Sequence, residues 1–240
     1  MSSKQNSRVP SRALLVSFSG LDGAGKSTQI AHLQSVIAGV GMTSRTLAFW
    51  DDVVVLSRFR ESFVHKVYKS ERGIGAPGKP VARRDKNVRA WYLSLARHGL
   101  YLLDAMHLCW VVARARNSRT NVLIFDRYIY DELANLPLKH RSSRAFVRLT
   151  AAFVPTPDVA YLLDADPEAA CARKPEYPVE FLHKSRRAYF ALAGILKTMT
   201  LVPPLPLTDA KREVERAFMR RIGDPESARP SANLDIAPVA

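Results

Sequence analysis

Cysteine is scarce in this chain: Cys109 and Cys171 are the only two in 240 residues. They are far apart, match no metal-ligand spacing and lie in apolar helical patterns, so we expect two buried thiols in a reducing compartment. Long apolar runs are also missing. The nearest candidate, residues 100–115, contains Asp104 and Arg114 and falls short of the ~18 uninterrupted apolar residues that indicate a membrane span. No secretory signal is visible, and we expect a cytoplasmic protein without membrane segments.

Acidic residues are outnumbered, at 22 against 36 Lys and Arg, which gives a formal net charge of +14. Residues 58–89 alone carry ten Lys or Arg and three Asp or Glu. Such a segment attracts polyanions, either a nucleotide phosphate or a nucleic acid. Aromatic residues are not regularly interleaved with the basic ones, so a stacking platform for single strands is weakly supported. Most of this charge is therefore interpreted as a solvated basic surface, and nucleic acid is an unfavoured partner.

The chain shows no internal repeat and alternates strand with helix patterns. Strands are predicted over 13–19, 43–50, 121–125 and 159–163, with a short edge strand after them. Helices are predicted over 26–38, 55–70, 84–116, 131–136, 142–153, 179–198 and from Thr208 or Asp209 to 222, with Asp166 capping a shorter one. In the long helix, the residues expected to face the core are Val88, Trp91, Tyr92, Leu95, Leu102, Met106, Trp110 and Ala113.

This alternation predicts a three-layer α/β fold, a five-stranded parallel sheet with helices on both faces. Ligands of such sheets bind at the carboxyl ends of the strands. The length of the chain suits one domain, which we place over 13–222. Residues 1–12 and 223–240 are expected to be flexible tails.

The strongest motif is a phosphate-binding loop. Residues 20–28 read Gly-Leu-Asp-Gly-Ala-Gly-Lys-Ser-Thr and fit G-x-x-x-x-G-K-[ST], between a strand pattern and a helix pattern with Ile30, Leu33, Ile37 and Val40 on one face. Its glycines let backbone N–H groups turn around phosphate oxygens, Lys26 adds a charge, and the Ser27 hydroxyl can ligate Mg²⁺. The predicted ATP site comprises Gly20, Asp22, Gly23, Ala24, Gly25, Lys26, Ser27 and Thr28.

A second motif ends the strand over 121–125. Four apolar residues precede Asp126, whose carboxylate at a strand end can hold Mg²⁺ through water or orient the attacking oxygen. Arg127 adds a planar fork for a phosphate. The competing carboxylate is Asp164, but it precedes a helix start and is better interpreted as structural.

A third candidate is the proline-rich stretch 173–178, which begins Arg173-Lys174. Cations there could close over a transferring phosphoryl group as a lid and neutralise transition-state charge, or they could belong to a solvated loop. Our predicted catalytic set is therefore Lys26, Asp126, Arg127 and Arg173, with Ser27 and Asp126 as the metal-binding pair.

Taken together, these motifs resemble the thymidylate kinase family. Residues 18–28 look like its phosphate loop, Asp126-Arg127-Tyr128 resembles its Asp-Arg-Tyr/His motif, and 157–168 and 180–193 are similar to its fourth strand and the helix after its lid. The resemblance spans about residues 13–222. It implies Mg²⁺–ATP binding and γ-phosphoryl transfer to a nucleoside monophosphate, foremost dTMP. It also implies that Lys26 contacts the β- and γ-phosphates and that Arg127 contacts the transferring or acceptor phosphate. Homodimers are common in that family, and the long helix over 84–116 is a candidate interface.

Two departures from the family concern the acceptor. Its Arg-Glu-Pro-Gly-Gly-Thr-like segment is replaced here by Phe49-Trp50-Asp51-Asp52-Val53. The family's arginine on the third helix falls near Asp104 when counted without gaps, while Arg97 lies about two turns earlier. The candidate acceptor-binding residues are Trp50, Asp51, Asp52, Arg97 and Tyr128.

Asp51 and Asp52 also resemble an acidic residue that deoxynucleoside kinases carry after their second strand, where it serves as the base for a sugar hydroxyl. Residues 128–132 resemble a further segment of those enzymes. A helix N-cap is the structural alternative for Asp51 and Asp52. The leading hypothesis is an ATP- and Mg²⁺-dependent nucleoside monophosphate kinase. A deoxynucleoside or other hydroxyl kinase is the alternative, and a nucleic-acid-associated P-loop ATPase is less favoured.

Overall fold

The computed structural model describes residues 12–55 and 91–223, with side chains from Ala96 onward in the second range. Its strands are β1 (Leu14–Gly20), β2 (Ser44–Ala48), β3 (Val122–Asp126), β4 (Val159–Leu163) and β5 (Met199–Val202). All pair in parallel, in the order β2-β3-β1-β4-β5. The central strand β1 is buried at all seven positions, which fits its lack of charged residues; its two serines, Ser17 and Ser19, are buried as well. The predicted five-stranded parallel sheet is confirmed.

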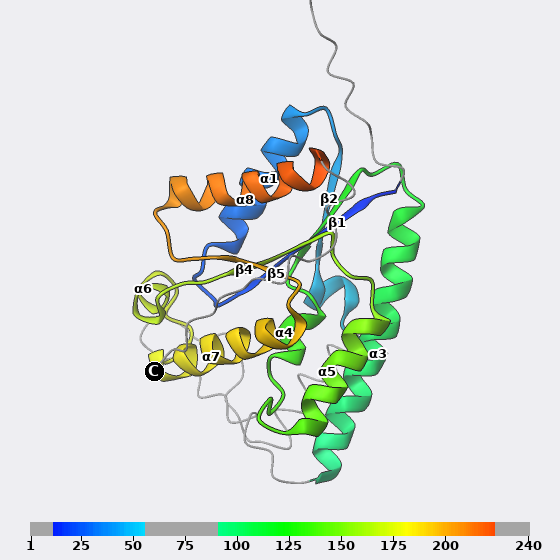
Figure 1. Cartoon of the computed structure of the whole chain (residues 1–240), viewed down its shortest axis with the longest axis vertical. Helices are drawn as coiled ribbons and strands as arrows, with labels where there is room; N and C mark the ends of the chain where they lie inside the picture. Colours follow the sequence, from blue (N-terminus) through cyan, green and yellow to red (C-terminus); the bar gives the residue numbers. More distant parts are fainter. Residues whose placement is uncertain (1–11, 56–90, 224–240) are drawn as a thin grey trace, which may run out of the picture.

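Helices cover both faces of this sheet (Figure 1). One face packs against α1 (Lys26–Gly39) and α8 (Leu207–Gly223). The other packs against α3 (Trp91–Arg116), α4 (Ile129–Leu133), α5 (Arg141–Phe153), α6 (Pro167–Arg173) and α7 (Val179–Leu196). Alternate residues of β1 enter the two cores, since Leu14, Val16 and Phe18 belong to the first and Leu15 to the second. The three-layer architecture follows directly.

Several local predictions need correction. The second strand ends at Ala48 rather than at residue 50, because a π-helical turn, η1 (Phe49–Val53), follows it. The last helix starts at Leu207, so neither Thr208 nor Asp209 caps it. Both cysteines are half-buried rather than buried. Asp166 does cap α6 as predicted, accepting a hydrogen bond from the Ala169 N–H at 3.0 Å.

The buried face of α3 also differs from the prediction. Leu102, Met106 and Trp110 are 41%, 50% and 57% exposed, and Ala113 is exposed as well. The buried apolar stripe is instead Tyr101, Ala105, Leu108, Val112 and Ala115. Side chains at Val88, Trp91, Tyr92 and Leu95, and the helix predicted over 55–70, lie outside the described residues.

Ends of the described segments are tied to the sheet. The Asp158 carboxylate, 2% exposed, accepts hydrogen bonds from the Leu15 N–H at 2.8 Å, Arg12 Nη2 at 2.9 Å and Arg221 Nη2 at 2.7 Å. Arg12, expected in a flexible tail, is therefore ion-paired. Within 12–55 and 91–223, no helix is both long and apolar enough to cross a bilayer.

Candidate active site

The phosphate loop lies at the carboxyl end of β1 and is seated tightly. Gly20 has φ +140°, and a Cβ there would lie 2.4 Å from the carbonyl oxygen of Leu163 in β4. Gly23 has φ +83°, and its Cβ would lie 2.4 Å from the carbonyl oxygen of Ala170 in α6. Gly25, with φ +87°, is the N-cap of α1. Glycine is therefore required for backbone shape at all three positions and for close approach at two.

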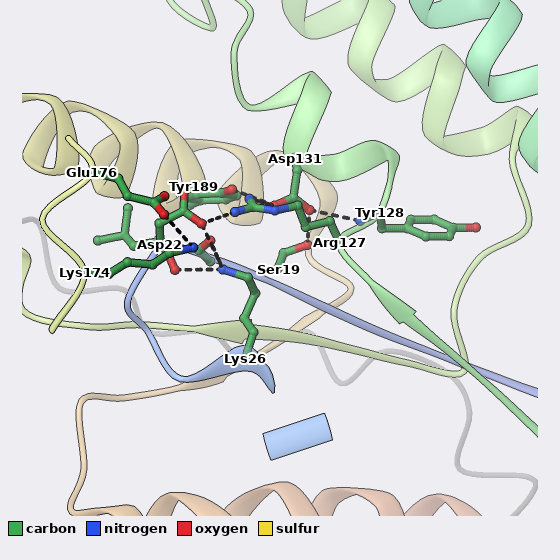
Figure 2. A network of polar contacts seen from close by, with 11 residues as sticks. Ser19, Asp22, Lys26, Arg127, Tyr128, Asp131, Lys174, Glu176 and Tyr189 are labelled. Atoms are coloured by element: carbon green, nitrogen blue, oxygen red, sulfur yellow. Dashed lines mark hydrogen bonds and ion pairs between the residues drawn. The ribbon is translucent and has the colours of Figure 1, made fainter. Parts of the chain in front are cut away.

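Lys26 begins α1 and is only 8% exposed. Its Nζ donates to the carbonyl oxygens of Gly20 at 3.0 Å and Leu21 at 2.8 Å, and lies 3.9 Å from Asp22 Oδ1 (Figure 2). Burial, helped by the nearby Arg127 guanidinium, lowers the pKa of Lys26 to about 8. The amine thus lies at the centre of the loop, where burial disfavours its positive charge and a bound anion would stabilise that charge.

Arg127 reaches the same loop from the end of β3. Its backbone has φ +67°, uncommon for a residue with a side chain, and its N–H bonds the Phe18 carbonyl oxygen at 2.9 Å. Its Nη2 pairs with Asp22 and its Nη1 lies 3.2 Å from Asp131 Oδ1. Burial opposes the charge, but Asp131, Tyr189 and Asp22 together raise the pKa of Arg127. Figure 2 shows the Arg127 guanidinium between Asp22 of the loop and Asp131 of α4.

Asp131, in α4, is the residue that sequence reasoning missed. It is 3% exposed. Its Oδ2 accepts from Ser19 Oγ at 2.7 Å and the Tyr128 N–H at 3.0 Å, and its Oδ1 from the Tyr189 hydroxyl at 2.6 Å as well as from Arg127. The available signal was its position, four residues after Arg127 and at the third position of a helix, where carboxylates cap backbone N–H groups.

Asp126 ends β3 between the two neighbouring strands, in register with Phe18 of β1 and Ala48 of β2. Its Oδ1 is buried and has no hydrogen-bond partner among the described residues. Ser27, in the first turn of α1, is exposed. Oxygen donors of this kind suit Mg²⁺, which takes one or two protein ligands together with phosphates and water. No cluster of three or more His, Cys, Asp or Glu able to hold a metal occurs in the described parts of the chain.

The candidate acceptor residues lie on different elements. Trp50, Asp51 and Asp52 are in η1, at the carboxyl end of β2. The Asp52 carboxylate accepts from the Ala48 N–H at 2.7 Å, but neither aspartate is the N-cap of η1, which is Ala48, so the predicted N-cap role is wrong. Both Asp51 and Asp52 are exposed. Trp50 is 41% exposed.

Helix α3 anchors the chain next to η1. Asp104, fully buried, accepts from the Val55 N–H at 2.8 Å, and His107 Nδ1 lies 2.6 Å from the Val53 carbonyl oxygen. Arg97 lies on the same helix and is half-buried. Asp104, near the α3 position where an ungapped count places the family's arginine, thus serves as an anchoring carboxylate.

Tyr128 does not fit its predicted role. Its ring is fully buried among core aromatics, and its hydroxyl donates to the Pro155 carbonyl oxygen. The side chain therefore has no surface to offer an acceptor. What the residue contributes to the site is its backbone N–H, which bonds Asp131.

The predicted lid stretch joins α6 to α7. Arg173 is exposed at the end of α6, Lys174 Nζ lies 3.2 Å from Glu176 Oε1, and Tyr177 is buried. Asp164 makes a two-pronged contact with Arg186, at 2.7 and 2.6 Å, which supports the structural interpretation of that carboxylate. A cavity of about 170 Å³ lies between this stretch, the loop and the β5–α8 connection; its lining includes Ala24, Gln29, Ala169, Arg173, Pro204 and Ala210.

A glycine-rich loop between a central parallel strand and its helix, with a buried lysine and an arginine fork beside it, defines a P-loop nucleotide-binding fold. No protein-family model matches the chain. It is 23% identical over 204 residues to a probable thymidylate kinase of Methanosphaera stadtmanae, covering 83% of this chain and 94% of that protein. It is also 23% identical over 221 residues to a probable thymidylate kinase of Archaeoglobus fulgidus, covering 85% and 94%.

Among solved structures, the fold is similar to thymidylate kinase from Candida albicans, with a TM-score of 0.55 and 17% identity over 91% of this chain and 94% of that one. The resemblance inferred from the motifs is confirmed: the chain is thymidylate kinase-like in sequence and in fold.

Proposed function

We propose that this protein transfers the γ-phosphoryl group of Mg²⁺–ATP to a nucleoside monophosphate, with dTMP as the acceptor, in the cytoplasm. The observation that carries the proposal is the convergence of Lys26 and Arg127 on Asp22 in a phosphate loop, within a thymidylate kinase-like chain. The acceptor phosphate is largely ionised at neutral pH and needs no general base. The phosphorus–oxygen bond to the leaving ADP breaks as a bond to the dTMP phosphate oxygen forms, which yields ADP and dTDP.

The donor side is supported by the loop and the cavity beside it. Backbone N–H groups of residues 20–28 and the start of α1 favour the triphosphate. The cavity adjoins the loop at Ala24, so it is the natural place for the base of ATP. Gln29, 3% exposed, lines it, and its Oε1 has no partner among the described residues. That oxygen can accept a hydrogen bond from an exocyclic amine.

Catalysis in this proposal is positioning and charge stabilisation. Lys26 binds the β- and γ-phosphates once they replace the loop carbonyls as its partners. Arg127 turns one arm of its fork from Asp22 to the transferring group, and Arg173 approaches from the lid stretch. Ser27 and Asp126 would hold Mg²⁺, which supplies charge neutralisation between the phosphates when bound. The remaining loop residues, including Thr28, contribute backbone contacts.

On the acceptor side, Trp50 offers an exposed indole for stacking on a base. Arg97 lies on α3, the helix that anchors the η1 region through Asp104 and His107. We assign Arg97 to the acceptor phosphate and the exposed carboxylate of Asp51 to its sugar. Asp52 acts by holding η1 in place through its bond to Ala48.

One observation favours a second candidate. Asp51 is exposed at the carboxyl end of β2, beside the strand that ends at Asp126, where a base for a sugar hydroxyl would have to lie. A nucleoside kinase would use thymidine rather than dTMP. Both acceptors therefore belong in the first assay.

The test is ADP production from ATP with dTMP, with thymidine and without acceptor, using purified protein and Mg²⁺. We expect turnover with dTMP, loss of at least ~10³-fold in Lys26→Ala, and a retained cooperative unfolding transition in that variant. Turnover with thymidine alone would replace the first function by the second. Turnover with neither acceptor, in a protein that binds ATP, would refute both.

A second copy of the chain is our candidate partner, because α3 and α5 contact each other and both carry exposed large apolar side chains. They are Leu102, Leu103, Met106 and Trp110 on α3 and Leu149 and Phe153 on α5, each 41% to 67% exposed. The two helices run side by side in Figure 1. A patch of this kind marks an interface, and we infer a homodimer through these helices.

A further inference from the structure

We propose that Tyr189 of α7, acting through Asp131, is a positioning residue that holds Arg127 in the orientation needed for phosphoryl transfer; this inference rests on the proposed function. Three elements meet there, as Figure 2 shows: the end of β3, helix α4 and helix α7. Neither Asp131 nor Tyr189 can itself contact substrate extensively, since they are 3% and 8% exposed. Their role must be exerted on a neighbouring group.

The Asp131 carboxylate cannot rotate without breaking hydrogen bonds on both oxygens. Oδ2 is fixed by Ser19 Oγ at 2.7 Å and by the Tyr128 N–H at 3.0 Å. Oδ1 is fixed by the Tyr189 hydroxyl at 2.6 Å and faces Arg127 Nη1 at 3.2 Å. The Tyr189 contact is the shorter of the two on Oδ1, so the tyrosine holds that oxygen together with the two bonds on Oδ2.

Arg127 needs this support because its guanidinium is shared between two carboxylates. Asp22 belongs to the loop that receives the nucleotide, so the contact with Asp22 is the one that an arriving phosphate competes with. Asp131 lies in α4, outside the loop, and is buried. One arm of the fork thus remains held while the other is free to change partner, and an arginine held in advance loses less entropy when it binds the transition state.

Tyr189 also joins this site to the lid stretch, because α7 begins immediately after residues 173–178. Burial and the adjacent Asp131 carboxylate raise the pKa of Tyr189 well above 10, so the phenol remains a donor. Helix α7 therefore connects the end of the lid stretch with the Asp131 oxygen that accepts from Arg127.

The kinetic experiment compares Tyr189→Phe with Tyr161→Phe. Each variant removes one buried hydroxyl that donates a hydrogen bond, but Tyr161 donates to the Val214 carbonyl oxygen in the other core, at 2.7 Å. We expect Tyr189→Phe to lower kcat about tenfold with KM for ATP changed less than about twofold. Tyr161→Phe should lower the unfolding midpoint comparably and leave kcat unchanged. Equal kcat in both variants and wild type overturns the inference.

A double-mutant test isolates the path of the effect. If Tyr189 acts through Arg127, Tyr189→Phe should have almost no effect on kcat in an Arg127→Lys background. An undiminished tenfold loss in that background would show that Tyr189 acts independently of Arg127 and would overturn the inference.

A measurement without turnover separates this inference from the proposed function. The rotation rate of the Arg127 guanidinium is read by ¹⁵N NMR, with the signal assigned by its loss in Arg127→Lys. We expect slow rotation in wild type, rotation at least about tenfold faster in Tyr189→Phe, and no change in Tyr161→Phe. Unchanged rotation in Tyr189→Phe refutes the positioning role. Faster rotation in a protein that phosphorylates neither dTMP nor thymidine supports the held arginine and refutes only the function.

Discussion

Lys26 couples nucleotide binding to proton uptake. Burial and Arg127 lower the pKa of its amine to about 8, and a triphosphate placed against it favours the charged form. If binding restores a pKa of about 10.5, the amine changes from roughly 0.1 to nearly 1 proton at pH 9, so each ATP should bring in about 0.9 proton. At pH 7 the amine is already about 0.9 protonated, and the corresponding uptake falls to about 0.1.

Calorimetric titration of Mg²⁺–ATP at pH 9, in two buffers with different heats of ionisation, measures this uptake directly. ATP is fully ionised at pH 9 and adds no proton of its own. Lys26→Arg is the matched control, because its guanidinium stays charged at every accessible pH and should abolish the uptake. Identical heats for wild type in the two buffers would refute the reasoning.

The same pKa predicts how stability depends on pH. The unfolded amine titrates near 10.5 and the folded one near 8, so the unfolded state binds more protons between these values. Stability should therefore rise with pH across that window, by up to about 3 kcal/mol from Lys26, and should not vary with pH on account of Lys26 below it. Urea unfolding of wild type against Lys26→Met from pH 7 to 10.5 checks the sign. A difference that stays constant over this range contradicts the assignment.

Three further predictions concern the scaffold and the assembly. Asp158→Ala removes an acceptor shared by one backbone and two arginine donors, so it should lower the free energy of unfolding in urea by about 3 kcal/mol. The less buried ion-pair variant Glu213→Ala should lower it by less than about 0.5 kcal/mol, and equal losses would contradict this. Gly23→Ala should weaken ATP binding at least about tenfold, because Gly23 has φ +83° and an added Cβ would collide with the α6 backbone. Gly39→Ala, where the Cβ would enter open space, should leave ATP binding unchanged, and calorimetry compares the two variants. Trp110→Glu should convert the inferred dimer to monomer in light scattering without loss of fold, and a wild-type monomer would refute the interface.

The sequence was sufficient for the sheet and the loop because their signals are local. A mostly apolar strand, glycines at fixed spacing and a helix with apolar residues on one face follow one another within residues 13–40. Three of the four predicted core positions after the loop are buried: Ile30, Leu33 and Ile37. Asp126 and Arg127 were found in the same way, as polar residues that end a buried strand.

The face of α3 could not be predicted because apolar residues surround the helix over 100–115. Tyr101 and Leu102 are equally good core candidates by period, and contact with η1 and α5 decides between them. The role of Asp131 was also inaccessible, since its partners Ser19 and Tyr189 come from β1 and α7 and meet only through the sheet register. The π-helical turn η1 ends β2 early, and there the Asp52 carboxylate accepts from the N–H of Ala48, the last residue of β2.

Because the first strand, β1, lies in the middle of the sheet, the sheet can form only late during synthesis. β1 pairs Leu14 with Val122 on one side and Val16 with Val159 on the other, so neither edge can be satisfied until much of the chain has emerged from the ribosome. The phosphate loop therefore remains exposed during synthesis until β3 and β4 have been made and can pair with β1. Assembly of this protein should be slow and nearly all-or-none, and fragments that stop short of β4 should aggregate rather than bind nucleotide.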